Sequence, residues 1–301
     1  MTLTCCVNNN SLNSQRNVDP TRTFSLRKRF EAILVKRFRK IRKKILEVII
    51  EDDVFGLIAT NVLEQGRFAF PKSADKVSSF MSWLEQAEAQ DILETFYAFD
   101  GRRKESSWMN IYIRSAYQRG VLRAAAELKK RGIPYLSLSL EEIFMSPFHA
   151  DAVALLYTRG FNELKGITDE MDKQISRVLA EGLANGENPR KIAYDIVDRV
   201  DKIGITRARV LARTEIIRAH HEANMNEYEL AGISDLEVYA ELLTAGDSRV
   251  CQRCFALEKR SKAKPYTIEE MRGVIPVHPN CRCVAVPFTK EFRELKNRRK
   301  R

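Results

Sequence analysis

The chain has 301 residues, of which 44% are hydrophobic, and a formal net charge of +11, a composition typical of one or two folded domains rather than of a disordered chain. No apolar run is long enough to span a membrane, and the polar N-terminus lacks the apolar stretch of a secretory signal, so the sequence favours a cytosolic setting over a transmembrane or secreted one. The excess of basic residues favours a polyanionic partner, whether nucleic acid, a membrane surface or an acidic protein face.

The two ends differ from the rest of the chain. Residues 1–22 are rich in Asn, Ser and Thr and predict a disordered tail. From Phe24 to Ile50 apolar residues recur at helical spacing, with many basic residues on the other faces, which predicts a basic amphipathic helix. That helix is either a solvated surface helix, a membrane-surface helix or a polyanion-binding arm. The candidate polyanion contacts are Arg37, Arg39, Lys40 and Lys43, together with Arg298 and Arg299 of the basic tail at 290–301.

The middle of the chain predicts a series of helices with short connections. Their positions follow from breaks at Gly and Pro and from capping residues. Helices are expected at 76–99, 105–131 and 150–164, and a short helix is expected to begin at Ser139 and to be interrupted by Pro147. Three more are expected from Thr168 to Gly186, from Asn188-Pro189 to Gly204, and from Thr206 to Ala231. Short connections favour antiparallel packing.

After Gly232 the pattern changes to short strands. Apolar and polar residues alternate over 236–242, and 274–277 and 284–286 are further strand candidates. The predicted fold is therefore mainly α: an antiparallel helical bundle followed by a small α+β zinc-binding lobe with short strands. The predicted divisions are a tail at 1–22, a helical region at 23–160, a domain at 161–289 whose Cys-rich lobe begins near 233, and the basic tail at 290–301.

Four cysteines and one histidine lie close together in this last region: Cys251, Cys254, His278, Cys281 and Cys283. A Cys-x-x-Cys pair presents two thiolates on one turn, which is half of a tetrahedral zinc site. Two ligand sets follow: Cys251, Cys254, Cys281 and Cys283, or three of these cysteines with His278. In a reducing compartment such clusters indicate metal more often than disulfides. The sequence thus predicts structural Zn²⁺, in competition with reduced thiols packed as small apolar residues.

The residues around this cluster are expected to have structural rather than catalytic roles. Asp247 and Arg249, just before Cys251, are expected to form a local salt bridge or turn contact. The polar stripe along the helix 206–231 is attributed to surface ion pairing and to contacts with the neighbouring lobe. No Ser or Cys nucleophile pairs with His220 or His221, so no catalytic residue is assigned and the chain is not expected to be an enzyme.

Several short motifs in order carry a resemblance to a known family. They are Ala208-Arg209, Ala212-Arg213-Thr214-Glu215, Asn224, Gly232, Asp247-Ser248-Arg249-Val250-Cys251-x-x-Cys254 and His278-Pro279-Asn280-Cys281-Arg282-Cys283. The region from about 167 to 287 resembles the phage Mu protein F-like minor head proteins, also called phage head morphogenesis proteins. The resemblance marks Arg209, Arg213, Thr214, Glu215, Asn224, Asp247 and Arg249 as family motif residues.

The resemblance implies a structural virion component inside the head, present in the host cytoplasm during assembly. Such proteins associate with the portal, capsid or scaffolding proteins and are linked to DNA packaging or ejection. Basic termini would gain from counterion release on packaged DNA, without sequence specificity. No small-molecule substrate is expected. The alternatives are a metal-dependent nuclease that uses His278 in a Cys/His finger, with Asp247 as the nearby carboxylate, and a host-side DNA-binding regulator.

Overall fold

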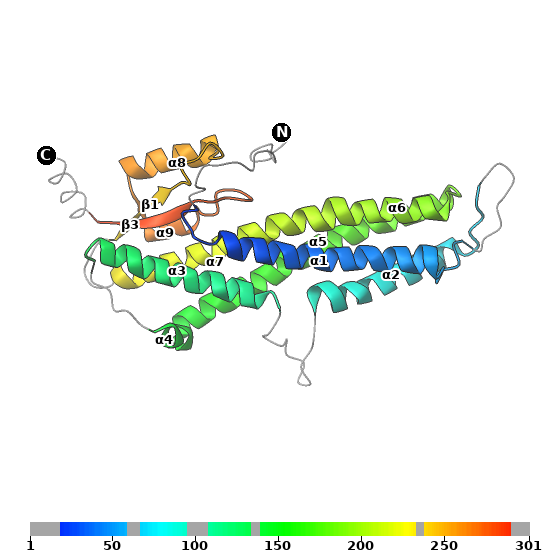
Figure 1. The fold of residues 1–301 in the computed structure, drawn as a ribbon, viewed down its shortest axis with the longest axis horizontal. Helices are drawn as coiled ribbons and strands as arrows, with labels where there is room; N and C mark the ends of the chain where they lie inside the picture. Colours follow the sequence, from blue (N-terminus) through cyan, green and yellow to red (C-terminus); the bar gives the residue numbers. More distant parts are fainter. Residues whose placement is uncertain (1–18, 59–66, 95–107, 134–138, 233–237, 290–301) are drawn as a thin grey trace. The chain divides into compact units, whose positions relative to one another are not determined.

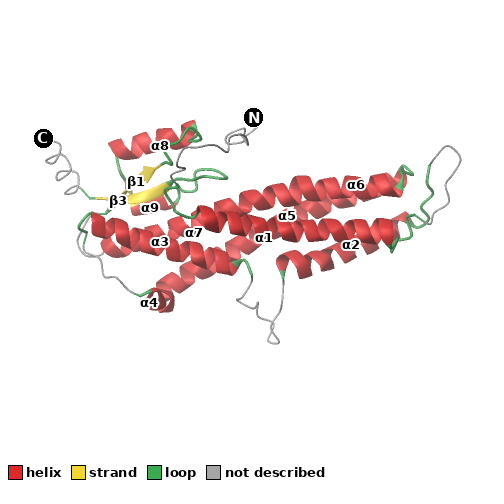
Figure 2. Cartoon of the chain, viewed as in Figure 1, coloured by secondary structure: helices red, strands yellow, loops and turns green. Residues whose placement is uncertain are grey.

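The computed structural model describes residues 19–58, 67–94, 108–133, 139–232 and 238–289 (Figures 1 and 2). The helices are α1 (Phe24–Leu46), α2 (Ser73–Glu88), α3 (Asn110–Lys130), α4 (Leu140–Met145), α5 (Pro147–Ala184), α6 (Pro189–Arg199), α7 (Thr206–Gly232), α8 (Gln252–Ala263) and α9 (Ile268–Arg272), and the strands are β1 (Tyr239–Leu243), β2 (Tyr266–Thr267) and β3 (Val284–Phe288). The expectation of a mainly helical chain with a small C-terminal sheet is confirmed.

The chain forms two compact units, each assembled from separate stretches. The bundle unit comprises residues 29–110 and 158–212, and the sheet unit comprises 1–28, 111–157 and 213–301. The predicted tails at 1–22 and 290–301, including Arg298 and Arg299, lie wholly or largely outside the described residues. Among the described residues, none of the helices combines the length and the apolar character that a membrane span requires.

Helix α1 is amphipathic, as its sequence predicts. In the bundle unit its apolar stripe is buried, and the stripe consists of Phe30, Leu34, Val35, Phe38, Ile41 and Ile45. Large side chains at this spacing stabilise a helix mainly through the packing of one face rather than through intrinsic propensity. The predicted helix at 76–99 begins slightly earlier, as α2, and continues through a π-helical turn at Ala89–Leu93.

The predicted break at Gly204 is wrong. A π-helical segment at Val200–Ile205 joins α6 to α7, and Thr206 has helical backbone angles instead of capping α7. Gly204 is required there for another reason. A Cβ atom at this position would lie 2.4 Å from Cδ1 of Phe38. The glycine therefore permits close packing against α1 and does not end a helix.

Thr168 also does not begin a helix, because α5 runs unbroken from Pro147 to Ala184. Its hydroxyl donates to the carbonyl of Lys165 within the helix, at 2.9 Å, which satisfies the side chain without a cap. The two other predicted caps are present. Ser139 and Glu142 form a capping box at α4, and Asn188 caps α6 with Pro189 as its first residue.

The sheet unit contains a three-stranded antiparallel sheet in the order β2–β1–β3. Residues Tyr239 to Leu243 of β1 pair with Phe288 to Val284 of β3. The predicted strand at 284–286 is present and extends to 288, whereas 274–277 forms turns and bends instead of a strand. Pro276 lies within that segment and has no amide hydrogen to donate to a sheet ladder.

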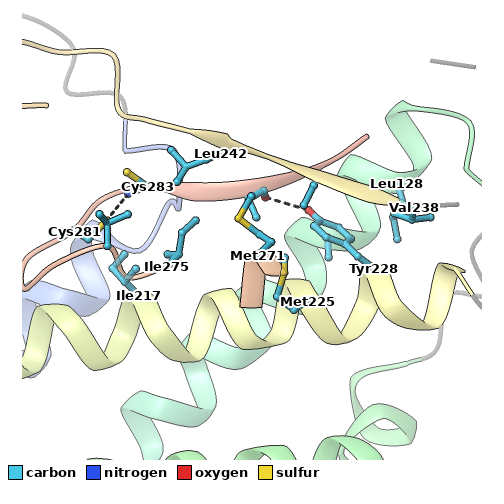
Figure 3. Close-up of a cluster of buried hydrophobic side chains, with 14 of the residues drawn as sticks. Leu128, Ile217, Met225, Tyr228, Val238, Leu242, Met271, Ile275, Cys281 and Cys283 are labelled. Carbon is cyan, nitrogen blue, oxygen red and sulfur yellow. Dashed lines mark hydrogen bonds between the residues drawn. The ribbon is translucent and has the colours of Figure 1, made fainter. Parts of the chain in front are cut away.

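One hydrophobic cluster joins this sheet to α7 (Figure 3). Ile217, Met225 and Tyr228 of α7 are buried beneath it, and the Tyr228 hydroxyl donates to the carbonyl of Ala285 in β3, at 3.3 Å. The same cluster includes Cys254, Cys281 and Cys283. The cysteines are therefore built into the core of the unit.

Candidate metal centre

The first two cysteines of the cluster, Cys251 and Cys254, lie at the start of α8. Cys251 is the N-cap of this helix, and its sulfur accepts the backbone N–H of Cys254 at 3.4 Å. The helical turn that follows brings the side chain of Cys254 back toward Cys251. The pair is thus held in position by the same hydrogen bond that begins the helix.

His278 is presented by a tight turn. The backbone N–H of Cys281 donates to the carbonyl of His278 at 3.1 Å, and Asn280 has φ of +64°. Pro at the second and Asn at the third position suit such a turn, because Pro fixes φ and Asn tolerates the left-handed region. The turn is fastened to α7 by a hydrogen bond of 3.4 Å from the Asn280 N–H to the hydroxyl of Thr214.

The imidazole of His278 is oriented as a metal ligand would be. Its Nδ1 lies 2.7 Å from the carbonyl oxygen of Pro279. Because a carbonyl only accepts, Nδ1 carries the proton and Nε2 keeps its lone pair. That Nε2 lies 3.3 Å from the sulfur of Cys251 and 3.2 Å from that of Cys254. A backbone carbonyl that fixes the ring in this way is the usual outer-shell partner of a zinc-bound histidine.

Cys281 and Cys283 complete the cluster from the stretch before β3. Both side chains are buried, and the N–H of Cys283 donates to the sulfur of Cys281 at 3.5 Å. Hydrogen bonding from the thiol of Cys254 lowers the pKa of Cys281, and the same contact raises the pKa of Cys254. Crowded thiols of this kind exchange protons for a divalent cation readily.

The donor atoms fit a zinc ion. They form two triads that share Cys254: Cys251, Cys254 and His278, and Cys254, Cys281 and Cys283, with the ligand atoms of each triad within 4.8 Å of one another. A zinc tetrahedron with Zn–S bonds of about 2.3 Å and Zn–N bonds of about 2.0–2.1 Å has S···N edges of roughly 3.5 Å, close to the spacing of His278 from its two thiols. Among the described residues these cysteines form no disulfide. The first triad lies within the predicted set of three Cys with His278, and the second lies within the predicted set of four Cys.

Asp247 is held by two arginines beside the cluster. Arg282 donates to both of its carboxylate oxygens, at 2.7 and 2.6 Å, and Arg249 donates to it at 2.8 Å. The bonds from Arg282 are the main reason that the pKa of Asp247 lies well below its usual range. The expected salt bridge with Arg249 is present. A metal ion at Asp247, as the nuclease hypothesis requires, would have to displace a bidentate guanidinium.

The family motif residues occupy several environments. Thr214, Asp247 and Arg249 contact the cysteine-bearing loops, as described above. Within α7, Glu215 is buried and pairs with Arg218 at 3.4 Å. Asn224 is buried and lies 3.4 Å from Nδ1 of His220. Arg213 is half-buried, and Arg209 belongs to the bundle unit, where it faces Glu31 at 3.8 Å.

The predicted polyanion contacts on α1 are largely engaged within the chain. Arg37 pairs with Glu94 at 2.7 Å, Lys40 with Asp91 at 2.8 Å and Lys43 with Glu47 at 2.9 Å. Arg39 is exposed. Three of these four cations therefore stand next to a carboxylate, which reduces the charge they offer to another molecule.

Sequence reasoning missed a buried polar chain in the sheet unit. Arg272 donates to Asn226 at 2.8 Å, Asn226 donates to the hydroxyl of Tyr117 at 2.6 Å, and that hydroxyl lies 2.8 Å from Nδ1 of His149. Burial lowers the pKa of His149, so its ring is neutral and accepts from Tyr117. No spacing rule links these residues, because they come from four different helices.

Sequence reasoning also missed helices α8 and α9, although each had a local signal. At α9 the signal is a capping box formed by Thr267 and Glu270. At α8 it is the N-cap at Cys251. Cys251 therefore both begins a helix and offers a ligand atom.

One comparison with known proteins gives a match. Residues 173–286 match the model of the family described as phage Mu protein F like protein. No curated protein and no solved structure matches the chain. The matched region takes in the end of α5, α6, α7 and the whole cysteine cluster. Residues 173–286 are therefore similar to the phage Mu protein F like family.

Proposed function

We propose that this protein is a minor head protein of a tailed bacteriophage, a structural component that acts in head morphogenesis. The observation that carries the proposal is the family match over 173–286, which contains the complete Cys/His cluster. Three of its residues, Cys254, Cys281 and Cys283, are buried in the core of the unit, which supports a structural role for the cluster. A metal held only by protein ligands shapes a fold, whereas a catalytic metal needs an open position.

The cluster is proposed to hold one Zn²⁺ through Cys251, Cys254, Cys281 and His278. His278 is favoured because its Nε2 faces two thiols while Pro279 fixes the ring. Cys281 is favoured over Cys283 because its sulfur accepts a backbone N–H, which stabilises a ligating thiolate, and because it closes the turn that presents His278. Cys283 then packs beside the site as a buried thiol.

The partners proposed are portal, capsid or scaffolding proteins during assembly and packaged DNA in the finished head. The support is the family match together with the net charge of +11, because a basic protein inside a head gains from releasing the counterions of DNA. Basic side chains of α1 and of the C-terminal tail are proposed contributors. The ion pairs of Arg37, Lys40 and Lys43 limit what α1 adds.

Mass spectrometry of purified virions with copy-number determination tests the proposal. The expected result is the chain in the particle at low copy number, with zinc in the isolated protein at about one ion per chain. Absence from virions, combined with Mg²⁺- or Mn²⁺-dependent DNA cleavage that His278→Ala abolishes, would establish the nuclease alternative instead. Absence from virions combined with tight duplex binding would favour a host-side regulator.

A further inference from the structure

The segment 249–264 is strongly basic. It contains one acidic residue, Glu258, and six basic ones, which are Arg249, Arg253, Lys259, Arg260, Lys262 and Lys264. Glu258 is buried, where it accepts from the hydroxyl of Thr244 at 2.6 Å and pairs with Lys262 at 2.7 Å. The segment therefore carries a net positive charge that its own carboxylate does not neutralise.

The basic side chains lie on the side of α8 that faces away from the sheet. Cys254, Glu258 and Ser261 form the buried side, and the hydroxyl of Ser261 accepts the backbone N–H of Leu242 in β1 at 2.9 Å. Figure 1 shows α8 along the outside of the sheet, opposite α7. All the other α8 residues except half-buried Leu257 are exposed.

The exposed side has an ordered arrangement. At 100° per residue, Ala256 and Ala263 lie along its centre. Arg253 and Arg260 fall on one flank of this small-residue strip, and Lys259 and Lys262 fall on the other, with the exposed Phe255 between them. Because the central residues are small, this side of the helix can come close to a partner surface. Its two rows of cations can then face two lines of negative charge on that surface.

Both ends of α8 are fixed by the fold. Its first turn carries Cys251 and Cys254 of the candidate metal centre, and its last turn is held to β1 by Ser261. The guanidinium of Arg260 also lies over the ring of Tyr266, and its carbon Cζ is 5.8 Å from the ring centroid. A cationic helix that is already ordered loses little entropy when it binds.

We propose that the exposed side of α8 binds the phosphates of double-stranded DNA without reading its sequence. A helix of about 10–12 Å diameter fits the major groove, which is about 12 Å wide and has a phosphate backbone along each side. Two cationic rows match these two backbones, whereas an acidic protein patch would not require cations on both flanks. The choice of DNA as the polyanion rests on the proposed function.

The experiment measures binding of the full-length, zinc-loaded chain to a 20-base-pair duplex by fluorescence anisotropy across a salt series. The test variant is Arg253→Gln/Lys259→Gln/Arg260→Gln. The control, Lys173→Gln/Arg177→Gln/Arg190→Gln, removes the same number and types of exposed cations from the bundle unit. Each phosphate contact contributes about 0.9 to the slope of log K against log salt. The magnitude of the slope should be smaller by about 2–3 in the test variant than in the wild type, and it should be unchanged in the control.

Equal slopes in the two triple variants would overturn the proposal. So would an α8 variant that loses binding to poly-L-glutamate but not to DNA, because that outcome assigns the surface to an acidic protein. Arg253→Lys/Arg260→Lys, which keeps the charge, should retain the slope. If the triple variant loses zinc, the single variants Arg253→Gln and Lys259→Gln replace it, each with an expected slope loss of about 0.9.

The salt-series experiment and the virion measurement test different claims, so one can fail while the other holds. A chain that is absent from particles but binds DNA through α8 contradicts the proposed function and leaves this contact standing. A chain that is present in particles but shows equal slopes contradicts only the contact.

Discussion

At the scale of single residues, one turn organises the cluster of Cys251, Cys254, His278, Cys281 and Cys283, because Pro279 fixes the imidazole of His278 and Cys281 closes the turn. Spacing places the five side chains near one another along the chain. It does not reveal that Pro279 orients the imidazole or that the N–H of Cys283 points at the sulfur of Cys281. Those contacts depend on a turn conformation, and they suggest which four residues bind the ion.

The proposed ligand set predicts an asymmetric response to substitution. Cys254→Ser and His278→Ala should each lose the bound zinc, because each removes one of four ligands, whereas Cys283→Ser should keep about one ion per chain. Metal analysis of the three purified variants by plasma mass spectrometry measures this. Retention in His278→Ala together with loss in Cys283→Ser would instead establish the four-cysteine set.

A second residue-scale prediction concerns the buried Glu88 and the half-buried Asp172 in the bundle unit. Burial and the neighbouring charge of Asp172 raise the pKa of Glu88 to about 9, and burial raises the pKa of Asp172 to about 6. Glu85, Asp169 and Lys165 also face this pair. Because both folded-state pKa values exceed those of the unfolded chain, the native state binds more protons, and stability falls as pH rises from about 4 to 9.

The substitution Glu88→Gln tests this pH dependence. The amide cannot ionise, so the variant should unfold at a temperature at least about 2 °C above wild type at pH 8 and should show a flatter pH profile. Thermal melts at pH 5 and pH 8 provide the comparison, with the exposed Glu181→Gln as the control. A wild-type chain that becomes more stable between pH 5 and pH 8 would contradict the assignment.

At the scale of secondary-structure elements, two of the four predicted caps are present, Ser139 and Asn188, and two are not, Thr168 and Thr206. Ser139 and Asn188 act as expected because a cap depends on a few adjacent residues. The role of Gly204 depends on packing against the distant Phe38, whereas Thr168 lies inside an unbroken helix and bonds to the carbonyl of Lys165. Glycine in particular is ambiguous, since helix ends and close helix contacts both select it.

Gly120 in α3 is a glycine that the close approach of α7 requires. A Cβ atom there would lie 2.4 Å from the carbonyl oxygen of His220 and 2.6 Å from Cβ of Ala223, both in α7. Backbone cannot move aside cheaply, so Gly120→Ala should destabilise the protein by about 1–3 kcal/mol. Gly166→Ala in α5 is the matched control, because nothing lies within 4 Å of its Cβ. That control should be neutral or stabilising by up to about 1 kcal/mol.

Urea unfolding of the two alanine variants measures the difference. Equal midpoints for Gly120→Ala and Gly166→Ala would show that the packing of α3 against α7 is looser than these distances indicate.

At the scale of the whole molecule, the sequence predicted the mainly helical class and the small C-terminal sheet. It gave no sign that compact units would combine stretches far apart in the chain, as the sheet unit does with residues 1–28, 111–157 and 213–301. Local periodicity cannot report such long-range assembly. The consequence for stability is that the cysteine cluster shares its core with Ile217, Met225 and Tyr228 of α7, so loss of metal should loosen the contact with that helix.

The most direct test of this account is limited proteolysis of the purified chain before and after zinc removal by a chelator, read out by mass spectrometry. We expect about one zinc per chain, a C-terminal lobe (residues 238–289) that resists protease while zinc is bound, and new cleavage sites confined mainly to that lobe once the metal is gone. A chain that carries no transition metal and yet protects the same residues would contradict the central claim that an ion bound by Cys and His side chains holds this part of the molecule together.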